Sequence, residues 1–73
     1  MKNTIEWISI YDRLPEKNGR YLVTFSWAGV RLVDIMSFYK QGLEFSWRSD
    51  QFKHRNMRTN VVAWAEMIPY MDI

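Results

Sequence analysis

The sequence contains no cysteine, which excludes disulfide bonds as a source of stability. It also contains a single histidine, so the Cys and His ligands of a structural zinc site are missing. A chain of 73 residues forms one domain at most and buries only about 60% of the surface that its unfolded form exposes. We therefore expect a single domain over 1–73, ordered over 6–70, that is stabilised by apolar packing or by association.

Glycine and proline are also scarce, with three and two residues, and this argues against a disordered chain. No apolar run approaches the roughly 20 residues that span a bilayer. The opening residues, MKNTIEW, lack the apolar core of a signal peptide. We therefore expect a cytoplasmic protein that does not enter a membrane.

Aromatic side chains are what the sequence has in abundance, with four each of Trp, Tyr and Phe. Each one removes roughly 150 to 250 Å² from water when it is buried. Bulky rings therefore supply the contact area that a small core needs.

Three segments have the residue pattern of β-strands. Residues 20–27 and 43–49 alternate with a period of two, and residues 30–39 are rich in branched and aromatic side chains. Turns at 28–29 and 40–42 join these segments as hairpins. Residues 61–68 form either a further strand or a short helix, and the pair Val61-Val62 favours the strand.

The fold that this pattern predicts is mainly β, with a β-rich α+β fold as the alternative. We expect one sheet, a small antiparallel meander of about four strands, either open or curled into a partly open barrel. The segment before the first long strand is expected to cover one face of this sheet. Trp7 and Leu14 would pack there as plugs, and Pro15 would fix the angle at which the chain leaves the cover.

The segment 48–60 is polar and basic, and we interpret it as a loop with at most one helical turn. Ten Lys and Arg residues against eight Asp and Glu leave a net charge of +2, which by itself does not imply a nucleic-acid partner. The local concentration within 48–58 nevertheless leaves one alternative function open, a small nucleic-acid-binding protein. Its expected binding residues are Arg48, Phe52, Lys53, Arg55 and Arg58, with the ring stacked on a base and the cations on phosphates.

No set of residues suited to catalysis is present. His54 is the one candidate base, and it lies between Lys53 and Arg55 in the basic segment, with no adjacent acidic residue that would orient it. The three glycines stand singly, so there is no phosphate-binding loop, and the acidic residues are scattered. We predict a protein that is not an enzyme and that has neither a cofactor nor a metal site.

Two motifs carry a resemblance to a known family. The opening has a Trp-Ile-Ser-Ile segment, three variable positions, a Leu-Pro pair and a Tyr-Leu-Val strand, residues 7–10, 14–15 and 21–23. It is similar to the opening of a small family found mostly in phages and prophages, domain of unknown function 551. The end of the chain resembles the closing motif of the family at Asn60, Val61, Trp64, Met67 and Pro69. Ala63 stands where the family usually has a histidine, and Glu66 replaces a proline.

The resemblance implies a bacterial cytoplasmic setting and a phage- or prophage-type accessory protein, and it implies no reaction. We expect this protein to bind a host protein, as an inhibitor of a defence or regulatory complex does. Trp, Tyr and Arg dominate binding hot spots. The expected partner-binding residues are Trp27, Tyr39, Trp47 and Arg48. A free sheet edge also accepts a strand from a partner or from a second copy, so a homodimer is a further expectation.

Overall fold

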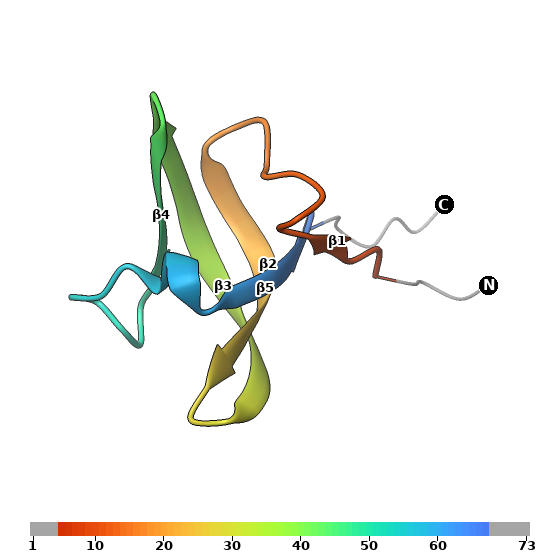
Figure 1. The fold of residues 1–73 in the computed structure, drawn as a ribbon, viewed down its shortest axis with the longest axis vertical. Coiled ribbons are helices and arrows are strands. Elements are labelled where there is room, and N and C mark those ends of the chain that lie inside the picture. The colour runs from red at the N-terminus through yellow and green to blue at the C-terminus, as the bar shows by residue number, and fades with distance from the viewer. Residues whose placement is uncertain (1–4, 68–73) are drawn as a thin grey trace, which may run out of the picture.

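The computed structural model describes residues 5–67, which form one antiparallel sheet of five strands (Figure 1). The strands are β1 (Ile8–Ser9), β2 (Gly19–Trp27), β3 (Val30–Gln41), β4 (Glu44–Ser49) and β5 (Val61–Ala65), and a 3₁₀ helix, η1 (Met57–Thr59), precedes β5. Their order across the sheet is β1-β5-β2-β3-β4. The prediction of a mainly β fold in one sheet is confirmed, and the sheet is open, with β1 and β4 at its edges.

Two tight turns build the central meander. Trp27 pairs with Val30 across the turn Ala28-Gly29, and both turn residues have positive φ, 52° and 81°. Two such residues in a two-residue loop form the turn type whose twist matches that of the strands. The second turn contains Gly42, at φ 63°, and lies one residue later than expected because Gln41 still pairs with Glu44.

The last strand, β5, lies inside the sheet, between β1 and β2. Residues 61–65 are a strand, as their branched side chains indicated, and β5 pairs with β2 on the side opposite to β3. β1 pairs with β5 in turn, with Ile8 opposite Trp64. The sheet has five strands where about four were expected because the N-terminal segment contributes this short edge strand.

The chain crosses β5 between β1 and β2. Both strands are antiparallel to β5 and lie on either side of it, so residues 10–18 must pass over β5. Pro15 is buried there, and Leu14 and Ile10 pack against the core. The expectation that this segment covers one face is confirmed for these residues.

Trp7 does not act as a plug, and that expectation was wrong. It is 39% exposed. Its neighbour Ile8 packs against the core opposite Trp64, and successive residues of an extended chain point to opposite faces. Trp7 is therefore directed to the other side of the sheet.

One face of the sheet carries the core, and we call it the inner face. The core consists of alternate residues of the strands and one residue of η1: Val23, Phe25, Met36, Phe38, Trp47, Met57, Val61 and Trp64. Rings dominate it, and the Phe38 and Trp47 centroids lie 4.7 Å apart. The opposite side of the sheet is the outer face. No helix in the described part of the chain is long and apolar enough to cross a membrane.

Candidate protein-interaction surface

The β2–β3 hairpin projects beyond its neighbours. β4 pairs with β3 only from Met36 to Gln41, and β5 pairs with β2 only from Leu22 to Phe25. Asn60, just before β5, still hydrogen-bonds to Ser26. The remainder of the hairpin, residues 27–35, therefore extends past the paired part of the sheet and is visible as the yellow-green tip in Figure 1. We call these residues the hairpin arm.

The β3 side of the hairpin arm is unusually apolar for an exposed strand. The exposed fractions are 55% for Val30, 43% for Leu32, 60% for Val33 and 39% for Ile35. Single exposed apolar residues are common on soluble proteins, whereas a contiguous group marks a surface that another molecule covers. The hairpin arm is therefore the first candidate for an interaction surface.

The apolar surface continues over the outer face of the sheet. Strand alternation places Val33 and Ile35 on that face, and the register sets Leu22 beside Ile35 and Ala65 beside Leu22. Extending the β1–β5 register by one pair brings Trp7 opposite Ala65. Ala65 itself is buried, so the accessible surface consists of Trp7, Leu22, Ile35 and Val33, which we call the outer apolar row.

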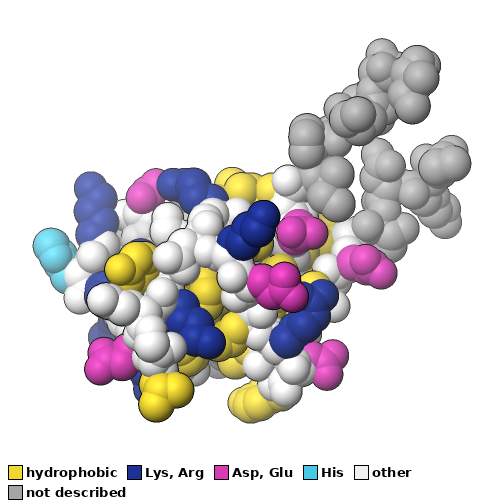
Figure 2. All heavy atoms as spheres, turned by 90° about the horizontal axis from the view of Figure 1, so that it is seen from above, with side chains coloured by type: hydrophobic (Ala, Val, Ile, Leu, Met, Phe, Trp, Pro, Cys, Tyr) yellow, Lys and Arg dark blue, Asp and Glu magenta, His cyan; other side chains and the backbone are white. Residues whose placement is uncertain are grey.

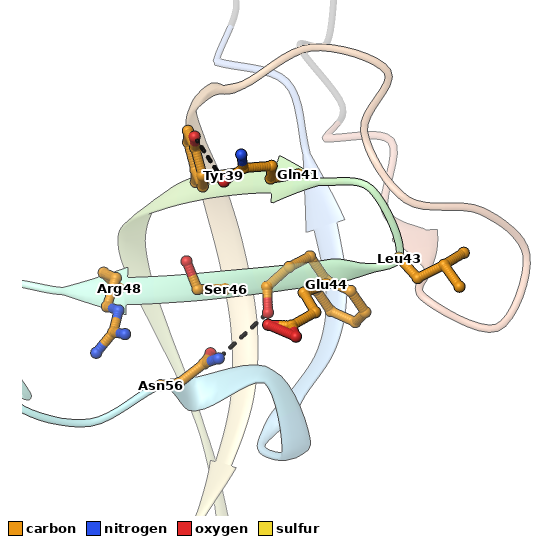
Figure 3. Close-up of a pocket in the computed structure, with 8 residues that line it drawn as sticks. Tyr39, Gln41, Leu43, Glu44, Ser46, Arg48 and Asn56 are labelled. Atoms are coloured by element: carbon orange, nitrogen blue, oxygen red, sulfur yellow. Dashed lines mark hydrogen bonds between the residues drawn. The ribbon is translucent and has the colours of Figure 1, made fainter.

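Two of the residues expected to bind a partner lie on this outer face. Tyr39 is 54% exposed, and Arg48 is exposed on the neighbouring strand. The register pairs Tyr39 with Ser46 and Arg48 with Ser37, so the two side chains belong to the same face. They contribute to a shallow hollow of about 620 Å³ at the β3–β4 end (Figure 3), whose lining is Tyr39, Gln41, Leu43, Glu44, Phe45, Ser46, Arg48 and Asn56.

Trp47 and Trp27, the other two residues expected to bind a partner, are not exposed on the outer face. Trp47 has no exposed surface, and its assignment to the interface was wrong. It pairs with Phe38 on the inner face, where strand alternation also directs Phe45. Trp27 is half-buried, with the ring of Phe52 4.7 Å away and the Arg55 guanidinium 5.1 Å from its centroid.

The basic segment does not present a free ring. Phe52 is half-buried and its ring lies 6.0 Å from Phe25, so it belongs to the edge of the core. Arg58 lies over Phe45 at 5.3 Å from the ring centroid, whereas Arg55 lies over Trp27. Lys53 and Arg48 are exposed. Figure 2 shows Lys and Arg side chains interspersed with acidic and neutral ones on the face drawn.

Asn56 is a structural residue that the sequence interpretation missed. Its Oδ1 accepts hydrogen bonds from Trp47 N (3.0 Å) and Arg58 N (3.1 Å), and its Nδ2 donates to Phe45 O (3.2 Å; Figure 3). The amide thus takes the place of a neighbouring strand on the outer edge of β4. An asparagine before a helical turn is a capping signal, but its contact with a strand depends on the tertiary fold.

No described cluster of residues has the chemistry of a catalytic or metal centre. Residues 5–67 contain no group of three or more His, Cys, Asp or Glu that could hold a metal ion. Burial, and secondarily the charge of Glu66, raise the pKa of Tyr21 above its ordinary value, which keeps the phenol neutral. Its hydroxyl donates to Lys17 O at 2.7 Å.

A family model described as protein of unknown function (DUF551) matches residues 6–67. The chain belongs to the DUF551 family. No curated protein and no solved structure matches it.

The DUF551 motif residues have distinct structural roles. Leu14 and Pro15 lie in the segment that crosses β5, and Trp64 is buried in the core opposite Ile8. Ala63, at the position usually occupied by histidine, pairs with Ser9 and Thr24. Pro69, the last residue of the closing motif, lies outside the described residues.

Proposed function

We propose that this DUF551 protein is a non-catalytic accessory protein of phage or prophage type that acts by binding a protein of its bacterial host. The observation that supports this most directly is the outer apolar row. Val33 and Ile35 are 60% and 39% exposed, and the row continues over the neighbouring strands. Apolar surface of this extent is a favourable target for a protein partner.

The surroundings of the row also suit a protein interface. Interfaces combine an apolar centre with a polar rim, and Tyr, Trp and Arg are enriched among their strongest contacts. Tyr39 and Arg48 lie on the same face as the row, beside the shallow hollow. In this proposal the protein inhibits a host defence or regulatory complex by occupying a surface of its target.

The proposal is tested by comparing capture from a bacterial lysate for three forms of the immobilised protein. The double variant Val33→Lys/Ile35→Lys places charges in the row at two positions that are already solvent-exposed. Tyr11→Lys is the matched control, because Tyr11 is 91% exposed and lies outside both the row and the hollow. Circular dichroism confirms that each form is folded.

We expect the wild-type protein and Tyr11→Lys to capture the same host protein and the double variant to lose it. Capture that survives the double substitution would rule out the outer apolar row. Binding through apolar contacts changes little with salt, whereas nucleic-acid binding weakens with about one counterion per phosphate contacted. Co-purifying nucleic acid that is released at moderate salt would favour the basic segment instead.

A further inference from the structure

The backbone of β3 has a free edge along the hairpin arm. In a hairpin closed by a two-residue turn, the pair flanking the turn exchanges both hydrogen bonds, and every second pair does the same. That pair is Trp27 and Val30, so the even-numbered residues of β3 bond to β2. The N–H and C=O groups of Arg31 and Val33 therefore point away from β2, along a stretch where β4 does not pair.

Two side-chain contacts agree with this assignment. The N–H of Ile35, an odd-numbered residue, donates to Asp34 Oδ1 at 2.8 Å and not to β2. The N–H of Lys40, an even-numbered residue, points to the β2 side and donates to Asn18 Oδ1 at 2.9 Å. Asn18 directly precedes the first residue of β2. The alternation thus holds along the whole strand.

Side chains satisfy edge groups at several places in the sheet, but not here. Asn56 covers β4 at Phe45 and Trp47, and Asp34 covers Ile35. Within residues 5–67, no hydrogen bond reaches the outward main-chain groups of Arg31 or Val33. An apolar edge strand with unpaired donors and acceptors is a template for another strand.

We propose that a second copy of the chain pairs with this edge, antiparallel to β3 and related by a two-fold axis at Leu32. Arg31 of each copy then exchanges both backbone hydrogen bonds with Val33 of the other. The five strands of each copy join into one continuous sheet.

The capped N–H of Ile35 selects this register. An axis at Val33 would pair Arg31 with Ile35. The N–H of Ile35 is not available for that pairing, because it already donates to Asp34 Oδ1. An axis at Leu32 needs only the free groups of Arg31 and Val33. It also avoids like charges opposite one another, because Arg31 then faces Val33 and Asp34 faces Val30 across the interface.

The pairing accounts for exposed residues that the proposed function leaves aside. Val30 and Leu32 are on the inner side of the hairpin arm, where Leu32 would meet its own copy. The two-fold axis is perpendicular to the sheet, so both outer faces remain on the same side and form one larger surface. The free stretch of β3, Val30–Ile35, spans about 20 Å at about 3.3 Å per residue. An interface of this size gives a weak dimer.

A cysteine placed at the axis tests the register directly, because the chain has no other cysteine. Residues directly opposite in a non-hydrogen-bonded pair have Cα atoms about 4.5 Å apart, within the range that a disulfide bridges. Leu32→Cys is compared with Val33→Cys under the same glutathione redox buffer. We expect the Leu32→Cys dimer to form at least about tenfold faster, since the two thiols are held at mM effective concentration or above.

The unlinked protein is measured by sedimentation equilibrium from about 10 µM to about 1 mM, the range expected for a small interface. We expect the wild-type protein and Tyr11→Lys to dimerise. Val33→Pro removes one outward donor without touching the β2–β3 hydrogen bonds and should stay monomeric. Leu32→Lys, which places two like charges at the axis, should also stay monomeric. This variant tests the dimer if the proline variant does not fold.

Three results would overturn the proposal: a wild-type protein that is monomeric at about 1 mM, a Val33→Cys dimer that forms faster than the Leu32→Cys dimer, or unchanged dimerisation of Leu32→Lys. None of them bears on host-protein capture, which depends on the outer apolar row and is measured separately.

Discussion

The indole Nε1 of Trp64 donates a hydrogen bond of 2.9 Å to the main-chain oxygen of Arg13, 51 residues away in the chain. The Arg13 guanidinium also lies over the same indole, 5.4 Å from its centroid. Two interactions thus hold the crossing segment against β5, which places Ile10 and Leu14 on the core. The closing tryptophan of the family motif secures the opening segment.

Replacing Trp64 with Phe removes this hydrogen bond and leaves the Arg13 carbonyl without its partner. We expect the free energy of unfolding to fall by about 2 kcal/mol, including the loss of buried ring area. Urea denaturation followed by far-UV circular dichroism measures the change. Trp7→Phe is the control and should change stability by less than about 0.5 kcal/mol, since Trp7 is 39% exposed. A larger effect at Trp7 than at Trp64 would contradict this account of the N-terminal segment.

Asn56→Ala removes three hydrogen bonds to the backbone at once. We expect a loss of about 2 to 3 kcal/mol in the free energy of unfolding, because the Trp47 N–H is partly shielded from water and has no substitute partner. The same denaturation experiment measures the change, with the exposed Gln51→Ala as control. Equal stability of the two variants would show that water replaces the amide on the β4 edge.

The turn at Ala28-Gly29 has an alanine where the backbone requires positive φ. A left-handed conformation costs a residue with a Cβ atom about 1 to 2 kcal/mol, and asparagine tolerates it better than alanine. Ala28→Asn should therefore raise the free energy of unfolding by about 0.5 to 1 kcal/mol, and Gly29→Ala should lower it by a similar amount. Thermal unfolding reads both effects. A melting temperature that falls for Ala28→Asn would contradict the turn assignment.

Tyr21 makes the stability depend on alkaline pH. The pKa of its phenol is raised above the ordinary value of 10.0, first by burial and second by the charge of Glu66. The folded protein then holds this proton more tightly than the unfolded chain, so its stabilising contribution is complete below pH 10.0 and is lost as the pH rises through the raised pKa.

Urea denaturation of the wild-type protein and Tyr21→Phe at about pH 9 and about pH 11 measures this contribution. The stability lost between the two pH values should be smaller in Tyr21→Phe. Glu66→Gln should lower the pKa of Tyr21 only in part, because burial is the larger cause, and spectrophotometric titration follows that shift. A Glu66→Gln protein with an unchanged tyrosine titration would exclude the contribution of this carboxylate.

The central strands were predictable because their pairing is local. β2, β3 and β4 follow one another through two-residue turns, and each carries its own alternating pattern. The same alternation directs Phe45 and Trp47 to one face and Arg48 to the other. It does not tell which face other segments cover, and this is why Trp47 was expected at an interface and lies in the core.

The candidate surface was predictable only in part for the same reason. Tyr39 and Arg48 proved exposed, as an interface requires, but the outer apolar row depends on registers between strands that are far apart in the chain. Leu22 and Val33 are apolar strand residues, so neither residue type nor local pattern distinguishes them from core residues. Their position follows from the absence of a second layer over that face among the described residues.

By itself the sequence determined that this chain builds its core from rings, forms a small antiparallel sheet and belongs to a family that its two ends identify. Alternation, turn residues and motifs involve residues that are close together in the chain, so they can be identified from the sequence alone. Only the tertiary structure decided that β1 adds an edge next to β5, that Asn56 covers one edge and that the edge at Arg31 and Val33 is free. Those outcomes depend on which strands, far apart in the chain, pair with one another and at which residue each pairing ends. The residue pattern of one strand does not contain this information.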